Sequence, residues 1–285
     1  DLKPGDVILQ LNGEKTQDVI KREAKYISAA TYGWMKYRLA TELLRGKEKS
    51  EMKLKVKRGR ETFDLTIPRS AGIMKVYQEY RKLINPVHYN KVDDGIYYLN
   101  LDVISKKEIE EIMPRLKKAR GIICDLRGYP NSNHVLISHL MKPGTKDEAK
   151  WMHVPHVIYP DYEKVTFDHL GWGMTPKEPH LTAKTVFIIT GRAISYAESY
   201  MKYIEHFNLA TIIGEPTAGS NGNINPFNLP GGYYISWTGM HVTKHTGKQH
   251  HGIGVVPHIP MEPTVKGIRE GRDELLEKAI EIIKK

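Results

Sequence analysis

TVFIITGRAISYAESYMKYIE (residues 185–205) joins a run of β-forming residues to a run typical of a helix. Val186 to Ile189 predict a buried strand, and the spacing of apolar residues after Ser195 predicts an amphipathic helix. Serine is a preferred helix N-cap, and Glu198 three residues later completes the pattern of a capping box. The same position also places a hydroxyl beside the free N–H groups of a helix N-terminus, where an oxyanion can be stabilised. On this stretch alone, the cap is the simpler interpretation.

Strands and helices alternate from about residue 94 onward, which predicts an α/β layer fold. The predicted strands are GIYYLNL (95–101), GIICDLRG (121–128), TVFIIT (185–190), ATIIGEP (210–216) and the Gly-rich return strand HHGIGVVPHI (250–259). The predicted helices are SKKEIEEIMPRLKKA (105–119), NHVLISHLM (133–141), AESYMKYIEHF (197–207) and GRDELLEKAIEIIKK (271–285).

Residues 1–69 follow a different pattern and predict a separate unit. Asn12-Gly13 is a strong hairpin turn signal, and helical stretches are expected near 17–29 and 33–45. Alternating residues on both sides of Gly59 predict a β-hairpin. We therefore expect two domains, residues 1–69 and residues 75–285. The chain begins without Met or a signal-like stretch, which suggests a fragment of a longer protein.

The composition excludes several classes of protein. The chain has 285 residues, 40% of them hydrophobic, so it can bury a core, and no apolar run is long enough to span a membrane. Its single cysteine, Cys124, excludes an internal disulfide and a thiolate metal cluster. The net charge of +10 comes mainly from lysines interleaved with acids, which favours a solvated basic surface over a nucleic-acid site. No metal or cofactor is expected.

Four short motifs occur in a fixed order: DLRGYPNSN (125–133), ISYAES (194–199), GEPTAGSNG (214–222) and GIGVVPHI (252–259). They follow LKPGDVILQLNGE (2–14), which resembles the middle of a PDZ domain. Together they resemble the C-terminal processing peptidases, a serine peptidase family that includes the tail-specific and tricorn-type enzymes. The resemblance implies a crotonase-like α/β peptidase core after a partial PDZ-like unit. It also implies that Ser195 is the nucleophile.

The resemblance assigns further roles around Ser195. The backbone N–H groups of Tyr196 and of the Asn131-Ser132 turn would form the oxyanion hole. The residues expected to contact substrate are Gly128, Gly219, Ser220 and Asn221. We therefore expect loops 128–133, 217–223 and 249–254 to gather around the serine.

The general base is where this sequence departs from the family pattern. The tail-specific enzymes use a lysine where Ser220-Asn221 stands here, and the tricorn-type histidine would precede residue 1. His251 occupies the place of the supporting glutamate, so it is either a base, a supporting group or a surface histidine. The resemblance implies a serine endopeptidase that cleaves peptides or unfolded proteins. Because the expected base is missing, we expect chain 1–285 to be inactive or nearly so. Family resemblance suggests the cell envelope or periplasm, although the lone cysteine also fits the cytoplasm.

Two other functions stay open. One is a non-catalytic module that binds peptides or other ligands on the same fold, which the missing lysine and the altered Asn131-Ser132 turn favour. The weaker one is a PDZ-anchored scaffold or a nucleic-acid binder that uses the basic surface.

Overall fold

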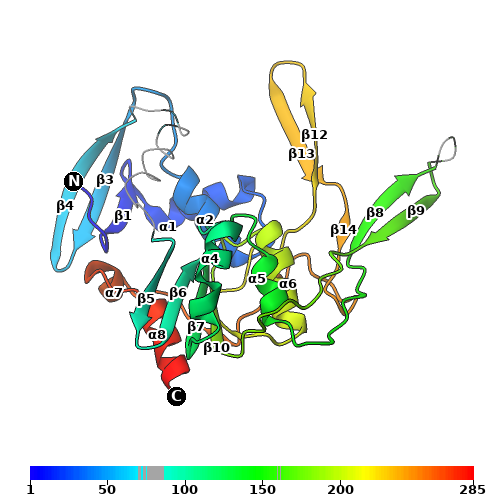
Figure 1. Ribbon diagram of the computed structural model, residues 1–285. Helices are drawn as coiled ribbons and strands as arrows, with labels where there is room; N and C mark the ends of the chain where they lie inside the picture. Colours follow the sequence, from blue (N-terminus) through cyan, green and yellow to red (C-terminus); the bar gives the residue numbers. More distant parts are fainter. Residues whose placement is uncertain (70–71, 73–74, 76–86, 159, 161) are drawn as a thin grey trace.

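The computed structural model describes residues 1–69, 72, 75, 87–158, 160 and 162–285. The beginning of the predicted 75–285 domain therefore lies largely outside the described residues. Figure 1 shows the chain from its N-terminal sheet to the C-terminal helix.

Residues 1–69 have a four-stranded sheet of their own, with strand order β2-β1-β3-β4. Its strands are β1 (Val7–Leu11), β2 (Glu14–Lys15), β3 (Glu51–Arg58) and β4 (Glu61–Pro68). The helical segments are α1 (Thr16–Glu23), η1 (Ala24–Tyr26) and α2 (Tyr32–Glu42). Asn12 and Gly13 both have positive φ angles, 50° and 88°, so the β1–β2 turn uses the residues that tolerate this conformation best.

The second sheet has six strands in the order β15-β11-β10-β7-β6-β5. They are β5 (Tyr89–Asp93), β6 (Ile96–Asn100), β7 (Gly121–Leu126), β10 (Lys184–Ile189), β11 (Thr211–Gly214) and β15 (Ile259–Pro260). All neighbours are parallel except β5, which runs antiparallel to β6. The carboxyl ends of β7, β10 and β11 therefore meet at one edge, where open α/β sheets place their sites.

Helices cover both faces of this sheet, which confirms the predicted α/β core (Figure 1). One face packs against α4 (Lys106–Leu116), α5 (Val135–Leu140) and α6 (Tyr196–His206). The other packs against α8 (Glu274–Lys284), which is capped by the side chain of Asp273. Alternate strand residues serve the two faces: Phe187 and Ile189 join the first core, and Val186 and Ile188 join the second. The short helix α7 (Val265–Arg269) precedes α8.

Two hairpins that the sequence did not predict project from the core (Figure 1). One is formed by β8 (Met152–Val157) and β9 (Val165–Leu170), with β14 (His241–Val242) paired to β8. The other is formed by β12 (Ile224–Leu229) and β13 (Tyr233–Thr238). Among the described residues, no helix is long and apolar enough to cross a membrane.

The prediction of a return strand over 250–259 is wrong for most of its length. Only Ile259–Pro260 forms a strand there. Gly252 and Gly254 have φ angles of 80° and 70°, and the N–H groups of Ile253 and Gly254 both turn back to the carbonyl of His250. These turns are incompatible with an extended strand.

Candidate active site

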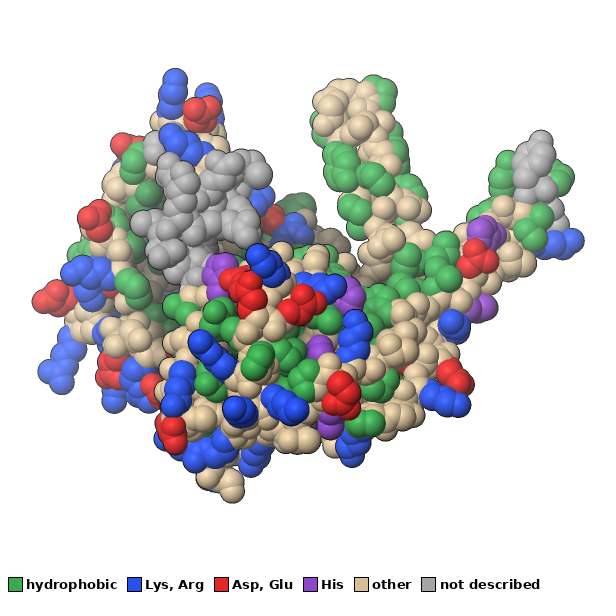
Figure 2. Space-filling view, viewed as in Figure 1, with side chains coloured by type: hydrophobic (Ala, Val, Ile, Leu, Met, Phe, Trp, Pro, Cys, Tyr) green, Lys and Arg blue, Asp and Glu red, His purple; other side chains and the backbone are tan. Residues whose placement is uncertain are grey.

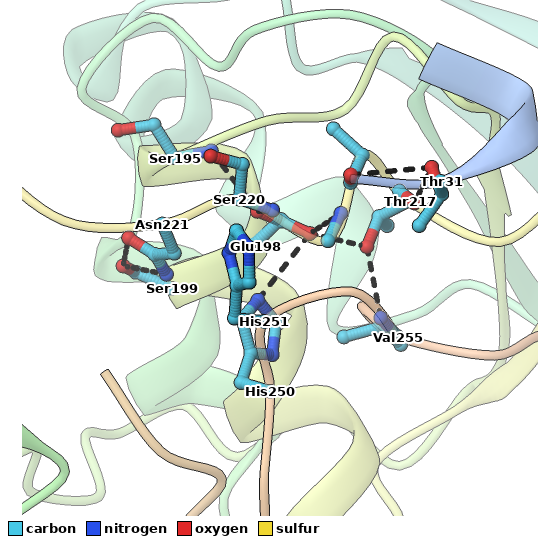
Figure 3. Close-up of polar contacts among 12 residues, drawn as sticks. Thr31, Ser195, Glu198, Ser199, Thr217, Ser220, Asn221, His250, His251 and Val255 are labelled. Atoms are coloured by element: carbon cyan, nitrogen blue, oxygen red, sulfur yellow. Dashed lines mark hydrogen bonds and ion pairs between the residues drawn. The ribbon is translucent and has the colours of Figure 1, made fainter. Parts of the chain in front are cut away.

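Ser195 lies between the end of β10 and the first residue of α6, as the sequence predicts. Its backbone angles, φ 57° and ψ −112°, are unfavourable for any residue but glycine. Its N–H donates to the carbonyl of Ser220 at 3.0 Å and to Glu198 Oε2 at 3.3 Å. Figure 3 shows the hydroxyl pointing away from Glu198, and the residue is partly exposed. A serine held on such a strand-to-helix turn presents its oxygen to a ligand.

Glu198 holds this turn in place from within the protein. Its side chain is completely buried. Besides the N–H of Ser195, the carboxylate accepts hydrogen bonds from Thr217 Oγ1 at 2.6 Å and from the N–H groups of Gly219 at 2.7 Å and Ser220 at 3.0 Å (Figure 3). A single carboxylate therefore joins the first turn of α6 to the loop after β11. The sequence predicts only a capping role for Glu198, because the loop after β11 meets it only in the fold.

Two adjacent histidines, His250 and His251, lie near the Glu198 carboxylate but differ in burial. His250 is 1% exposed, and its Nε2 lies 3.3 Å from Glu198 Oε1 without the alignment of a hydrogen bond. The predicted residue, His251, is exposed. Its carbonyl accepts a hydrogen bond from Gln249, and no hydrogen bond connects its imidazole to Ser195 within the described chain. The structure therefore brings His250, and not His251, into contact with the carboxylate behind the serine.

The N–H of Tyr196 is the first backbone donor of α6. The next three N–H groups, of Ala197, Glu198 and Ser199, donate to the carbonyls of Ile194 and Ser195. No backbone acceptor is found for the Tyr196 N–H in the part of the chain described. The backbone donor beside Ser195 is thus available to a ligand oxygen, and its role in an oxyanion hole stays a prediction.

The other two expected oxyanion donors are occupied. The N–H of Asn131 donates to the carbonyl of Leu101 at 2.9 Å, and the N–H of Ser132 donates to that of Pro130 at 3.1 Å. Ser132 has a φ of 49°, so the turn is already folded back on itself. In this conformation neither group can donate to a substrate, and this assignment needs correction.

The residues expected to contact substrate instead stabilise the site. The N–H groups of Gly219 and Ser220 donate hydrogen bonds to the Glu198 carboxylate. The side-chain amide of Asn221 donates to Ser199 Oγ at 3.0 Å. A Cβ at Gly128 would lie 2.0 Å from Asp102 Oδ2, so any larger residue there would have to displace the Asp102 carboxylate.

The carboxyl group of Asp102 lies beside the predicted site and has a raised pKa. Burial, followed by repulsion from Asp125, raises its pKa to about 6. Its Oδ1 atom is buried without a hydrogen-bond partner among the described groups. Asp125 is instead paired with Arg127 and accepts a hydrogen bond from Tyr98 at 2.7 Å. Arg127 therefore compensates the negative charge of Asp125, whereas Asp102, which follows β6, makes no ion pair among the described residues.

Aromatic rings surround the side chain of Tyr196. The ring centroid of Tyr129 lies 5.9 Å from that of Tyr196, and Trp172 lies 5.5 Å from it. His134 Nδ1 is 2.6 Å from the Tyr196 hydroxyl. Burial raises the pKa of Tyr196 to about 12, so the phenol stays neutral at physiological pH. The contact between Tyr129 and Tyr196 also brings loop 128–133 close to the turn at Ser195.

The N-terminal unit contacts the same loops. Thr31, the N-cap of α2, donates from Oγ1 to the carbonyl of Thr217 at 3.0 Å. Gly33 packs so closely on Gly191 that a Cβ on Gly191 would lie 2.2 Å from the Gly33 carbonyl carbon. Loops 190–192 and 217–219 are therefore supported from both units.

Comparison with known proteins settles the family. The model of peptidase family S41 matches residues 95–261, more than half of the chain. The chain belongs to peptidase family S41. The predicted relationship to the C-terminal processing peptidases is thus confirmed, and this S41 chain is a peptidase whose substrates are peptides or proteins.

Solved structures share its fold. Mature CPAF complexed with lactacystin superimposes with a TM-score of 0.73 at 16% identity, over 98% of the S41 chain and 77% of CPAF. A possible peptidase of Parabacteroides merdae ATCC 43184 gives a TM-score of 0.58 at 14% identity, over 94% and 88% of the two chains. No curated protein sequence matches significantly. No group of three His, Cys, Asp or Glu side chains in the described ranges is arranged to hold a metal ion.

Proposed function

We propose that this S41 peptidase is a serine endopeptidase in which Ser195 is the nucleophile. One observation carries the proposal: a strained serine at a helix N-terminus, next to a backbone N–H with no acceptor in the described chain. Ser195 Oγ would form a bond to the carbonyl carbon of the substrate while a base takes its proton. The Tyr196 N–H would donate to the oxygen as it becomes negative. The C–N bond then breaks, the amine leaves with a proton, and water hydrolyses the acyl-enzyme.

The general base belongs to the proposal as well. Two sources are compatible with the residues: a histidine upstream of residue 1, as in tricorn-type enzymes, or His251 after a movement of loop 249–254. We favour the upstream histidine because no His251 hydrogen bond to Ser195 exists within the described residues, and a serine without a base is a weak nucleophile. We further propose that residues 1–69 are a partial PDZ-like domain placed beside the peptidase core.

A peptidase assay distinguishes the two sources of the base. Chain 1–285, its His251→Ala variant and a longer chain that includes upstream residues are incubated with casein. We expect cleavage by the longer chain only. Robust cleavage by chain 1–285 that disappears in His251→Ala would instead make His251 the base.

A non-catalytic binding module is the alternative. It is favoured by the Asn131 and Ser132 N–H groups, which are both occupied. If no chain cleaves casein but each binds unfolded casein in a pull-down, the binding module is the better account.

A further inference from the structure

The hairpin formed by β12 and β13, here called the arm (residues 224–238), starts three residues after Asn221. Its two strands pair only with each other. None of its residues belongs to the three hydrophobic cores of the described chain. Figure 1 shows the arm standing clear of the body. A two-stranded hairpin in water is marginally stable by itself.

One face of the arm is almost entirely apolar. Residues that are directly opposite or two apart on antiparallel strands share a face. The register pairs Phe227 with Ile235 and Leu229 with Tyr233, and Trp237 lies on the same face at the base. We call these five residues the arm face. Each of these side chains is 40–70% exposed, and the ring centroids of Phe227 and Trp237 lie 5.6 Å apart.

The arm is also uncharged in a strongly charged protein. No Asp, Glu, Lys or Arg occurs from residue 216 to 243, although 27% of the chain is charged. Figure 2 shows the arm without acidic or basic side chains, whereas these are scattered over the body. The other hairpin differs, because it carries the carboxylate of Asp168, which lies 2.6 Å from Nε2 of His156. A contiguous exposed apolar surface of this kind marks an interaction site.

The charges indicate what covers the arm face. Two copies of a chain with net charge +10 repel each other, except where they meet through an uncharged surface. An anionic membrane is disfavoured, because no Lys or Arg lies between residues 203 and 243 to attract it. The apolar residues also extend from the base to the tip of the arm and are not confined to the tip.

We propose that the arm is a dimerisation element that packs face to face on the same arm of a second copy. Such a contact is self-complementary, as a twofold interface requires. The two hairpins would form two layers about 10 Å apart, each covering the apolar face of the other. Pro226 lacks an N–H and blunts β12 as an edge strand, which favours packing through the face over pairing through the edge.

Sedimentation velocity over a range of protein concentrations tests this proposal. The chain with Ser195→Ala, which excludes self-cleavage, is compared with variants that also carry Phe227→Glu and Ile235→Glu. We expect a concentration-dependent dimer that the two glutamates weaken at least 10-fold. The matched control is Tyr234→Glu, on the opposite face of the same arm, and it should leave the dimer unchanged. Thermal melting checks that every variant is folded.

Opposite charges separate a lost contact from a damaged arm. A variant with Phe227→Lys and Ile235→Lys should be monomeric alone and should form a mixed dimer with the glutamate variant. A monomer at every concentration, or a dimer that ignores both glutamates, would overturn the proposal. So would a monomer that floats with phosphatidylglycerol vesicles and loses this binding through Phe227→Glu, because the arm would then be a membrane contact.

Discussion

The turns that follow β7 and β10 leave neighbouring strands at the same edge of the sheet, yet their backbone N–H groups are satisfied in different ways. After β10, Ser195 is held in an unfavourable conformation and the adjacent Tyr196 N–H has no acceptor in the described residues. After β7, Ser132 also has a positive φ, but its N–H and that of Asn131 both bind carbonyls. Both turns are bent, so bending alone does not make an oxyanion hole.

The difference lies in what satisfies each turn. The buried carboxylate of Glu198 supports the β10 turn from behind, so its front donor remains free. In the β7 turn, by contrast, the N–H groups of Asn131 and Ser132 donate to the carbonyls of Leu101 and Pro130, so neither remains free. Turns of either kind look alike in a sequence, whereas the acceptors that satisfy their N–H groups are seen only in the fold.

The largest effect is expected from removing the proposed nucleophile in the β10 turn. Ser195→Ala in the full-length protein should lower casein cleavage by more than about 10⁴-fold, as loss of a catalytic serine does in other peptidases. Ser236→Ala, an exposed serine on the arm, is the control and should keep its rate within about twofold. Residual activity of Ser195→Ala above a few per cent would remove the serine from the mechanism.

The next effect concerns the support behind that turn. Glu198→Ala leaves four donors without their buried acceptor, so we expect the free energy of unfolding to fall by about 3–5 kcal/mol. Asn131→Ala in the β7 turn removes one hydrogen bond, from Nδ2 to the carbonyl of Val103, and should cost about 1 kcal/mol. Urea unfolding measures both. Equal costs would mean that the two turns are supported alike.

Asp102, next to the β7 turn, should make stability depend on pH. Its pKa rises from 3.8 to about 6 on folding. Between about pH 4 and pH 6 the folded state therefore binds more protons than the unfolded state, and stability falls as pH rises through this window. Asp102→Asn should abolish that fall, about 1–3 kcal/mol, in urea unfolding at pH 4 and pH 7.5. An unchanged pH dependence in the variant would show that Asp102 does not titrate in this way.

The smallest effect is expected at Ser132. Glycine adopts its φ of 49° without strain but loses more entropy on folding, so Ser132→Gly should change stability by less than about 1 kcal/mol. Because its N–H is already bound to Pro130, casein cleavage should stay within about threefold. A loss above 100-fold would show that this N–H takes part in catalysis after all.

The sequence predicted the parts of the fold that are driven by buried periodic residues. The run at 186–189 alternates between two cores, and the strands and helices around it follow the same rule. The β8–β9 hairpin and the arm were missed because most of their apolar residues stay exposed and belong to no core. The turns at Gly252 and Gly254 could not be distinguished from a strand, since their φ angles depend on contacts with loop 217–219.

The site was predictable in position but not in detail. The sequence correctly placed Ser195 between a strand and a helix, and the catalytic roles of Ser195 and the Tyr196 N–H stay predictions. It could not show which of two adjacent histidines turns inward, because the hydrogen bonds of Ile253 and Gly254 to the His250 carbonyl fix that orientation. It also could not show that Glu198 would consume the N–H groups of Gly219 and Ser220, since this depends on two segments that meet only in the fold.

Labelling with a fluorophosphonate tests the central claim most directly, because only an activated serine reacts with it. The full-length protein is treated with the probe, and the modified peptide is identified by mass spectrometry, with Ser195→Ala as the control. We predict one adduct, on Ser195, that is absent from the variant. An unlabelled full-length protein, or an adduct on another serine that persists in Ser195→Ala, would contradict the assignment of Ser195 as the nucleophile.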